Sequence, residues 1–262
     1  MKRGALVATV ILVACAQNTI AQIEHGTIIA WMATDTTVVV AADSRLAIID
    51  PDKIDPQPSF RDNDCKIRAL NGNLVFAAAG FLTGPSMFLG RWDVRQIAVD
   101  LARSRTVNSA SDIDNLAMEW AEALRHLQIF PSYQGIPEVQ AVFAGIVGIP
   151  KRTHAANIWV MISGLAPINF KVFEPDKDSR AIHTYGSGYN SLMGYARDHG
   201  PVIPDTNEQP DEDRLVGTTY RVTALAIKES TDHTVGGEID QVRLSAKGVE
   251  WIHRKPNCPA EQ

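Results

Sequence analysis

Clustered positive charge and metal-ligand patterns are both missing from this chain of 262 residues. Its 25 lysine and arginine residues form no run and are outnumbered by 30 aspartate and glutamate residues, which gives a net charge of −5. Nucleic-acid binding needs clustered basic side chains, so this distribution argues against a nucleic-acid partner. The sequence has no CxxC pair, no Cys/His spacing and no regular histidine spacing, so no metal site is indicated.

Two further motifs are absent. The sequence has no Gly-x-Ser-x-Gly elbow and no glycine-rich phosphate loop, so serine-hydrolase and nucleotide-binding classes lose their usual support. After the first 16 residues no apolar stretch approaches the length needed to cross a bilayer, and we expect no stable transmembrane segment.

The amino terminus is typical of an export signal. Met1, Lys2 and Arg3 are followed by a small and apolar run at 5–16, and 19–21 offers small residues for cleavage after Ala21. The sequence therefore predicts a signal peptide at 1–21 and a periplasmic or secreted protein. An alternative is a lipoprotein signal ending in Cys15, with that cysteine lipidated.

Only Cys65 and Cys258 remain once the leader is removed. An oxidising compartment could pair them, and the sequence leaves open whether they are paired or free.

The remaining chain alternates between strand-rich and helix-rich stretches. Strands are expected at 27–32, 37–42, 139–147, 158–162 and 169–173, and hairpins at 66–79, across Asn71-Gly72, and at 238–252. Helices are expected at 93–105, at 113–127 behind a Ser111 cap, at 190–197 and at 214–229. Residues 47–64, 151–154 and 175–178 are expected to be loops or turns.

This order predicts an α+β fold in one domain. Two antiparallel sheets packed face to face between two helical layers, a four-layer αββα sandwich, would bury these segments, and no linker divides them.

One constellation of residues identifies a family. Gly26-Thr27 opens a strand, and Ala41-Ala42-Asp43-Ser44-Arg45 ends the next one, with the threonine 16 residues before the aspartate. Lys66-Ile67 and Ala79-Gly80 follow, 14 residues separating Lys66 from Gly80. Two later landmarks are Gly186-Ser187-Gly188 and the run from Asp232 to Gly237. The chain thereby resembles the proteasome β-type subunits, which are threonine-type N-terminal-nucleophile (Ntn) hydrolases.

The resemblance implies a role for each residue. Thr27 is the nucleophile, and its own α-amine, with a pKa of roughly 7.7–8.0, is the base. Lys66 keeps that amine neutral and favours the alkoxide, while Asp43 holds Lys66 charged. The Gly80 amide binds the oxyanion, and Ser187 and Asp232 fix the amine. Arg45 is expected to be structural. These roles need no cofactor.

The amine exists only after the Gly26–Thr27 bond is cut, so we expect self-cleavage there. The predicted organisation is a signal peptide (1–21), a short propeptide (22–26), a hydrolase domain (27–255) and a tail (256–262). The implied substrate is a peptide or other amide, and the implied assembly is a homo-oligomer, with a ring as one form.

Two alternatives stay open at this point. One is an Ntn hydrolase of small amides, and the other is an assembly subunit without catalysis. The second is motivated by Val235, where active family members commonly carry serine, and by the long loop between Asp43 and Lys66.

Overall fold

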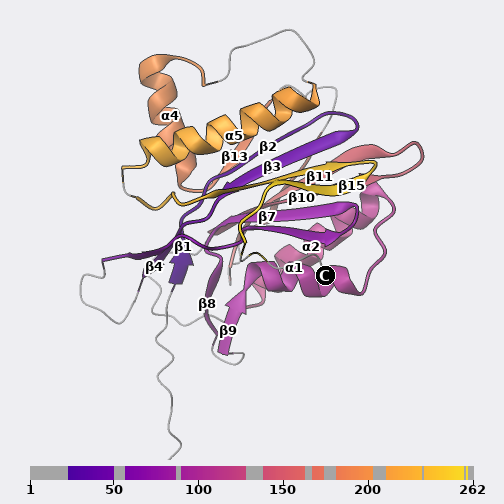
Figure 1. The fold of residues 1–262 in the computed structure, drawn as a ribbon. Helices are drawn as coiled ribbons and strands as arrows, with labels where there is room; N and C mark the ends of the chain where they lie inside the picture. The colour runs from indigo at the N-terminus through magenta and orange to yellow at the C-terminus, as the bar shows by residue number, and fades with distance from the viewer. Residues whose placement is uncertain are drawn as a thin grey trace, which may run out of the picture.

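The structure is a computed structural model, and it describes residues 23–49, 57–86, 90–127, 138–162, 167–173, 181–202, 211–231, 233–256 and 258. Within these ranges the chain is a mixed α/β protein with four helices and three antiparallel sheets of five strands each. The helices lie on opposite sides of two of the sheets, with α1 and α2 on one side and α4 and α5 on the other (Figure 1).

The first sheet, called the β2 sheet here, has the order β13-β2-β3-β14-β15. Its strands are β2 (Ile29–Ala33), β3 (Thr37–Asp43), β13 (His183–Tyr185), β14 (Ile239–Ser245) and β15 (Gly248–His253). The β14–β15 hairpin confirms the one predicted at 238–252, and the strands expected at 27–32 and 37–42 pair with each other as β2 and β3. β3 is buried along its whole length, as its unbroken apolar run predicts.

The second sheet, called the central sheet, has the order β12-β11-β10-β7-β6. Its strands are β6 (Ile67–Asn71), β7 (Leu74–Gly80), β10 (Glu138–Val147), β11 (Arg152–Met161) and β12 (Asn169–Val172). The hairpin across Asn71-Gly72 is confirmed. The turn predicted at 151–154 lies at 148–151 instead, because Arg152 already begins β11 and Thr153 is buried. Polar side chains at a strand end were mistaken there for a solvated loop. The turn expected at 175–178 lies outside the described residues.

The third sheet, called the leader sheet, was not predicted. It has the order β5-β4-β1-β8-β9, with β1 (Ile23–His25), β4 (Leu46–Ile49), β5 (Ser59–Arg61), β8 (Thr83–Ser86) and β9 (Gly90–Asp93). The loop expected at 47–64 is therefore wrong at 47–49 and 59–61, which are strands, whereas 57–58 and 62–64 lie outside any strand. Its strands are only three or four residues long, and its central strand β1 pairs with two strands, β4 and β8, that are distant in sequence.

The helices match the predicted periodicity closely. They are α1 (Val94–Arg103), α2 (Ala110–Arg125), α4 (Gly188–His199) and α5 (Glu212–Glu229). The cap of α2 is Ser109 and not Ser111: the Ser109 hydroxyl accepts from the Asp112 amide, and the Asp112 carboxylate accepts from the Ser109 amide. This reciprocal capping box satisfies two amides that would otherwise lack helical partners.

Three apolar clusters hold these elements together. Trp120 of α2 packs against Phe76 and Phe143 of the central sheet, with ring centroids 4.8–5.6 Å apart within the trio. A second cluster joins the inner faces of the β2 sheet and the central sheet, and a third packs α4 and α5 on the outer face of β2. Burial of each such side chain stabilises the folded state by about 1.5–3 kcal/mol. The clusters therefore hold in place the sheets next to Thr27, which precedes β2.

No helix among the described residues is both long enough and apolar enough to cross a membrane.

Candidate active site

Thr27 is fully buried and lies two residues before β2. Its amide donates to the Ser187 hydroxyl (3.2 Å), and its carbonyl accepts from the Gly188 amide (3.2 Å). The Thr27 hydroxyl donates a short hydrogen bond to the carbonyl oxygen of Gly26. The hydroxyl therefore lies against the one peptide bond whose cleavage would free the threonine amine.

Lys66, immediately before β6, approaches the same carbonyl from another direction. Its Nζ lies 3.1 Å from the Gly26 oxygen and 2.7 Å from Asp43 Oδ1, and it also donates to the Arg45 carbonyl. An ammonium group has three protons and no acceptor capacity, so these three oxygens satisfy it completely. The side chain is fully buried, which makes this satisfaction necessary.

Asp43 ends β3 and is the anchor of the site. Oδ1 accepts from the Ile28 amide (2.9 Å) besides Lys66, and Oδ2 accepts from the Gly236 amide (2.9 Å) and the Arg45 amide (3.3 Å). One carboxylate thus joins the strand after Thr27, the lysine and the 233–237 loop.

Burial opposes the charge on both members of this pair. Desolvation raises the pKa of Asp43 above its ordinary value, although Lys66 and the two amides act in the opposite direction. Desolvation likewise lowers the pKa of Lys66, against the attraction of Asp43. A lysine with a lowered pKa gives up a proton more readily than a surface lysine.

Ser187 stands at the N-cap of α4, where serine usually accepts a hydrogen bond from the first turn. Its hydroxyl makes no capping bond. It accepts instead from the Thr27 amide and, at 3.0 Å, from the Thr234 hydroxyl. The sequence position of Ser187 is therefore explained by its contact with Thr27 and not by helix capping.

Thr234 was missed by the sequence reasoning, which looked for serine at the next position. Val235 is buried in the apolar cluster under α4 and α5, with its neighbour Thr234 supplying a hydroxyl to Ser187. A hydroxyl residue one position away from the expected one was the available signal. Asp232 lies outside the described residues, so its expected role stays a prediction.

Two glycines bring backbone segments close to Thr27. Gly186 has φ +92°, and a Cβ there would lie 2.2 Å from the Thr27 carbonyl oxygen. Gly26 has φ +90°, and its Cβ would lie 2.5 Å from the Thr234 carbonyl oxygen. Both contacts and both dihedral angles require glycine. Gly80, with φ +100°, ends β7 beside Glu138, and its role in binding an oxyanion stays a prediction.

Arg45 makes the structural contacts expected of it. Its guanidinium forms a bidentate pair with Asp62, at 2.5 and 2.6 Å, and donates to the His233 carbonyl (3.4 Å). It thereby links the strand end after Asp43 to the 233–237 loop without touching Thr27.

A disulfide joins Cys65 to Cys258 across 193 residues, with their Cα atoms 5.5 Å apart. This answers the question that the sequence left open. Because Cys65 precedes Lys66, the bridge fastens the carboxyl-terminal segment directly behind the lysine. Lys255 reinforces the attachment by pairing with Asp240 (2.7 Å).

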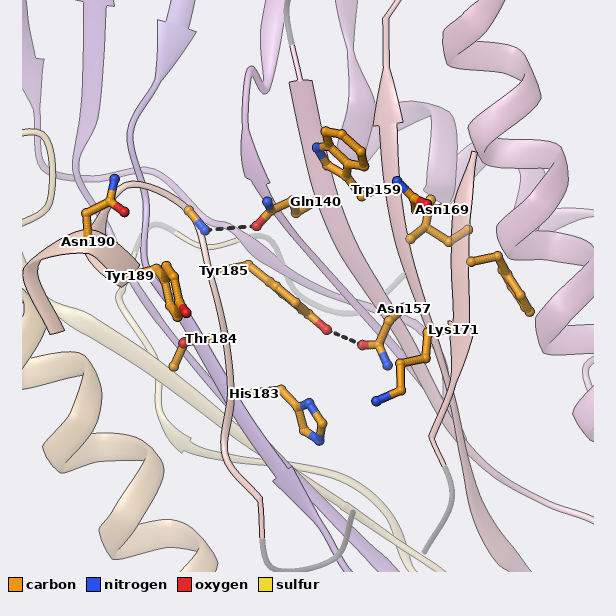
Figure 2. Close-up of a pocket in the computed structure, with 13 residues that line it drawn as sticks. Gln140, Asn157, Trp159, Asn169, Lys171, His183, Thr184, Tyr185, Tyr189 and Asn190 are labelled. Atoms are coloured by element: carbon orange, nitrogen blue, oxygen red, sulfur yellow. Dashed lines mark hydrogen bonds between the residues drawn. The ribbon is translucent and has the colours of Figure 1, made fainter. Parts of the chain in front are cut away.

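A cavity of about 590 Å³ opens beside Gly186, and Figure 2 shows its lining. Gln140, Asn157 and Tyr185 project into it from three strands. None of these residues was named from the sequence. Among the residues that the structure describes, no three histidine, cysteine or acidic side chains gather as a metal site would require.

No protein-family model matches the chain, and a search of the curated proteins finds no significant match.

Proposed function

We propose that this protein is a threonine-type N-terminal-nucleophile hydrolase of amide bonds, made as a precursor that cuts itself between Gly26 and Thr27. One observation carries the proposal: the Thr27 hydroxyl and the Lys66 ammonium both donate to the Gly26 carbonyl, and Asp43 holds that ammonium. Single residues of these types are common, and their convergence on one peptide bond supports a cleavage reaction there.

The activating step uses the groups in place. Thr27 Oγ attacks the Gly26 carbonyl carbon while Lys66 polarises its oxygen, and the hydroxyl proton passes to the threonine nitrogen as the C–N bond breaks. The product is an ester between Gly26 and Thr27. Water then hydrolyses this ester, releasing the leader as a carboxylate and leaving Thr27 with a free amine.

The same groups would then act on a substrate. The neutral α-amine takes the Thr27 hydroxyl proton, directly or through one water, as Oγ attacks the substrate carbonyl carbon. The amide C–N bond then breaks, the leaving amine takes that proton, and water hydrolyses the acyl-enzyme to a carboxylate and free Thr27. Ser187, already bonded to this nitrogen, orients the amine, and Thr234 orients Ser187. Lys66 stabilises the developing alkoxide by its charge, and the Gly80 amide is our proposed donor to the oxyanion.

The leader supplies a template for the substrate. β1 pairs with β4 on one side and with β8 on the other, as a central strand of the leader sheet. After cleavage the acyl part of a substrate peptide can occupy the same position as an added strand. We therefore propose an extended peptide as substrate, with the residues before the scissile bond lying between β4 and β8.

Fold and location follow as parts of the same proposal. The helices packed outside two facing sheets support the four-layer αββα arrangement of Ntn hydrolases. The Cys65–Cys258 disulfide supports export, since such bridges persist in oxidising compartments. A homo-oligomer, with a ring as one form, remains part of the proposal from the family resemblance.

Hydrolysis of small amides is the second candidate. The cavity beside Gly186 is lined by a mixture of polar and apolar side chains, which suits a compact ligand as well as a peptide.

Intact mass of the purified protein tests the proposal. Wild type should begin at Thr27, Thr27→Ala should keep the leader, and Thr27→Ser should be processed. Thr36→Ala, in the exposed turn between β2 and β3, is the matched control and should be cut normally. Retention of residues 22–26 in folded wild type would overturn the precursor mechanism, and equal peptide turnover by wild type and Thr27→Ala would overturn the hydrolase.

A further inference from the structure

The cavity beside Gly186 lies at the edge where the β2 sheet faces the central sheet. Its walls come from β10, β11 and β12 of the central sheet, from β13 of the β2 sheet and from the start of α4 (Figure 2). β12 and β13 are the terminal strands of their sheets, so among the described residues no further strand of either sheet covers that edge. A volume of about 590 Å³ is enough for a short segment of peptide.

Two amide side chains interrupt the apolar surface between these sheets. Val142 and Ala144 of β10 belong to the apolar cluster there. Gln140, two residues before Val142, and Asn157, directly opposite Val142 on β11, lie on the same face, because side chains alternate along a strand and opposite residues share a face. Asn157 is only 9% exposed. Buried amides need hydrogen-bond partners, so the partners of these two side chains determine what the cavity can bind.

The cavity wall already uses the oxygen atom of each amide. Gln140 Oε1 accepts from the Gly186 amide (3.2 Å), and Asn157 Oδ1 accepts from the Tyr185 hydroxyl, as the dashed lines of Figure 2 mark. The Tyr185 hydroxyl itself accepts from Trp31 Nε1 (3.3 Å). Burial raises the pKa of Tyr185 to about 12, so its hydroxyl keeps its proton and needs an acceptor. An amide hydrogen and a hydroxyl hydrogen both require oxygen opposite them, which fixes the orientation of the two side chains.

The nitrogen atoms of the same amides remain as donors for a ligand. Within the part of the chain that the structure describes, neither the Gln140 NH₂ group nor the Asn157 NH₂ group has a hydrogen-bond partner. Both residues line the cavity. An NH₂ group only donates, and a buried donor without a partner is unfavourable. The cavity therefore suits a group that presents two acceptor oxygens.

The spacing of the two donors indicates the kind of group. Gln140 lies opposite Trp159 in the β10–β11 register, so Gln140 and Asn157 are diagonal neighbours. Diagonal neighbours of an antiparallel pair lie about 7–8 Å apart, with their Cβ atoms somewhat closer. In an extended peptide, alternate carbonyl groups point to the same side and repeat every ~6.6 Å. Two carbonyl groups of one extended peptide, two residues apart, therefore match the two NH₂ groups.

The contacts of Thr27 indicate which part of a substrate lies here. In the proposed reaction the Thr27 nitrogen passes a proton to the leaving amine, and this nitrogen is bonded to Ser187, the residue after Gly186. The acyl part lies between β4 and β8, and neither strand lines the cavity. The cavity is therefore on the side of the leaving amine.

The strand order gives the direction of the leaving segment. Gln140 belongs to β10, which pairs with β7 and so with the strand that ends at Gly80. Asn157 belongs to β11, one strand further towards the sheet edge. Gln140 is therefore the inner donor and Asn157 the outer donor.

We propose that this cavity binds the backbone of the peptide segment that leaves as the amine. The Gln140 amide donates to a carbonyl near the scissile bond, and the Asn157 amide donates to a carbonyl two residues further along. This inference rests on the proposed hydrolysis of extended peptides. Because every peptide has these carbonyls, the cavity recognises the length of the leaving segment and not its side chains.

Processed enzyme and a series of peptides test the inference. The peptides share one acyl part and carry one, two, three or four alanines after the scissile bond, each ending in a carboxamide so that the charge is constant. We expect kcat/KM to rise about tenfold for each carbonyl that reaches a donor, about a hundredfold over the series. Equal rates for all four peptides would overturn the inference, while their hydrolysis would still support the proposed function.

Asn157→Asp removes only the outer donor. Aspartate keeps the size of the side chain and an oxygen that accepts from the Tyr185 hydroxyl. The variant should lose the outer tenfold increase and keep the inner one, and its response to a longer acyl part should equal that of wild type. Asn115→Asp adds the same charge at an exposed position of α2 and is the matched control. An undiminished outer increase in Asn157→Asp would refute the assignment.

Binding separates the two proposals if no peptide is cut. Thr27→Ala protein should keep its leader in the acyl position, which is not part of the cavity. Calorimetry with this protein should give about tenfold tighter binding of tetra-alanine amide than of di-alanine amide, a difference lost in Thr27→Ala/Asn157→Asp. This result would uphold the cavity assignment without catalysis. Equal affinities of the two peptides would refute it whether or not the enzyme is active.

Discussion

Removal of the Cys65–Cys258 bridge is the perturbation whose magnitude follows most directly from the structure. The bridge closes a loop of 193 residues, most of the folded chain. In the chain-entropy model a loop of this length restricts the unfolded state by about 5 kcal/mol at 25 °C. Residual structure in unfolded chains reduces the measured effect, so we expect Cys65→Ala/Cys258→Ala to lose about 3–5 kcal/mol. Alanine suits both sites because both cysteines are buried.

Equilibrium unfolding in urea, monitored by tryptophan fluorescence, measures this loss from the midpoint and slope. Wild type treated with a reductant should unfold at the midpoint of the double variant, which separates loss of the bond from loss of the sulfur atoms. The effect should also reach the active site, because Cys65 directly precedes Lys66, so processing at Thr27 should slow. A double variant within about 1 kcal/mol of wild type, at equal slope, would refute the entropic reasoning.

Two further substitutions test the buried pair and the close backbone approach. Lys66→Met should abolish processing and cost roughly 3–5 kcal/mol in urea unfolding, since it leaves the Asp43 carboxylate buried without its cation. Burial raises the pKa of Asp43, so in the folded variant this carboxylate takes up a proton at a higher pH than it does in the unfolded chain. The destabilisation caused by Lys66→Met should therefore shrink as the pH falls. A destabilisation independent of pH would contradict the assignment. Gly186→Ala should destabilise by about 1–3 kcal/mol and slow cleavage at Thr27, because its Cβ would meet the threonine carbonyl at 2.2 Å. Gly217→Ala, in α5 with no atom within 4 Å of its added Cβ, should instead stabilise by up to about 1 kcal/mol, and similar behaviour of the two alanine variants would contradict the strain argument.

Sequence patterns over a few neighbouring residues were sufficient to predict much of the secondary structure. The apolar run of β3, the Asn71-Gly72 turn and the periodicity of α2 each act over a few neighbouring residues, and all three are confirmed. Helix ends were located less precisely. The cap of α2 was predicted at Ser111 and lies at Ser109, because the hydroxyl of either serine can accept a hydrogen bond from the first helical turn. The strands of the leader sheet were missed since three-residue strands form only with distant partners.

The candidate site likewise contains residues that the sequence identified and a residue that only the structure revealed. Thr27, Asp43 and Lys66 were identified by type and spacing, and the structure brings them together around one carbonyl. Thr234 escaped detection because a loop can present either of two successive side chains, and only packing of Val235 into the core decides which.

The sequence by itself therefore predicted Thr27 as the nucleophile with Lys66 beside it, and it located the helices and the longer strands, since these depend on residue type and short spacing. Only the tertiary structure decided that Cys65 pairs with Cys258, that the leader is a central strand, and that Gln140, Asn157 and Lys171 share one cavity. The physical reason is distance along the chain. These contacts join segments tens to hundreds of residues apart, and a shift of one residue in strand register would turn the cavity side chains to the opposite face.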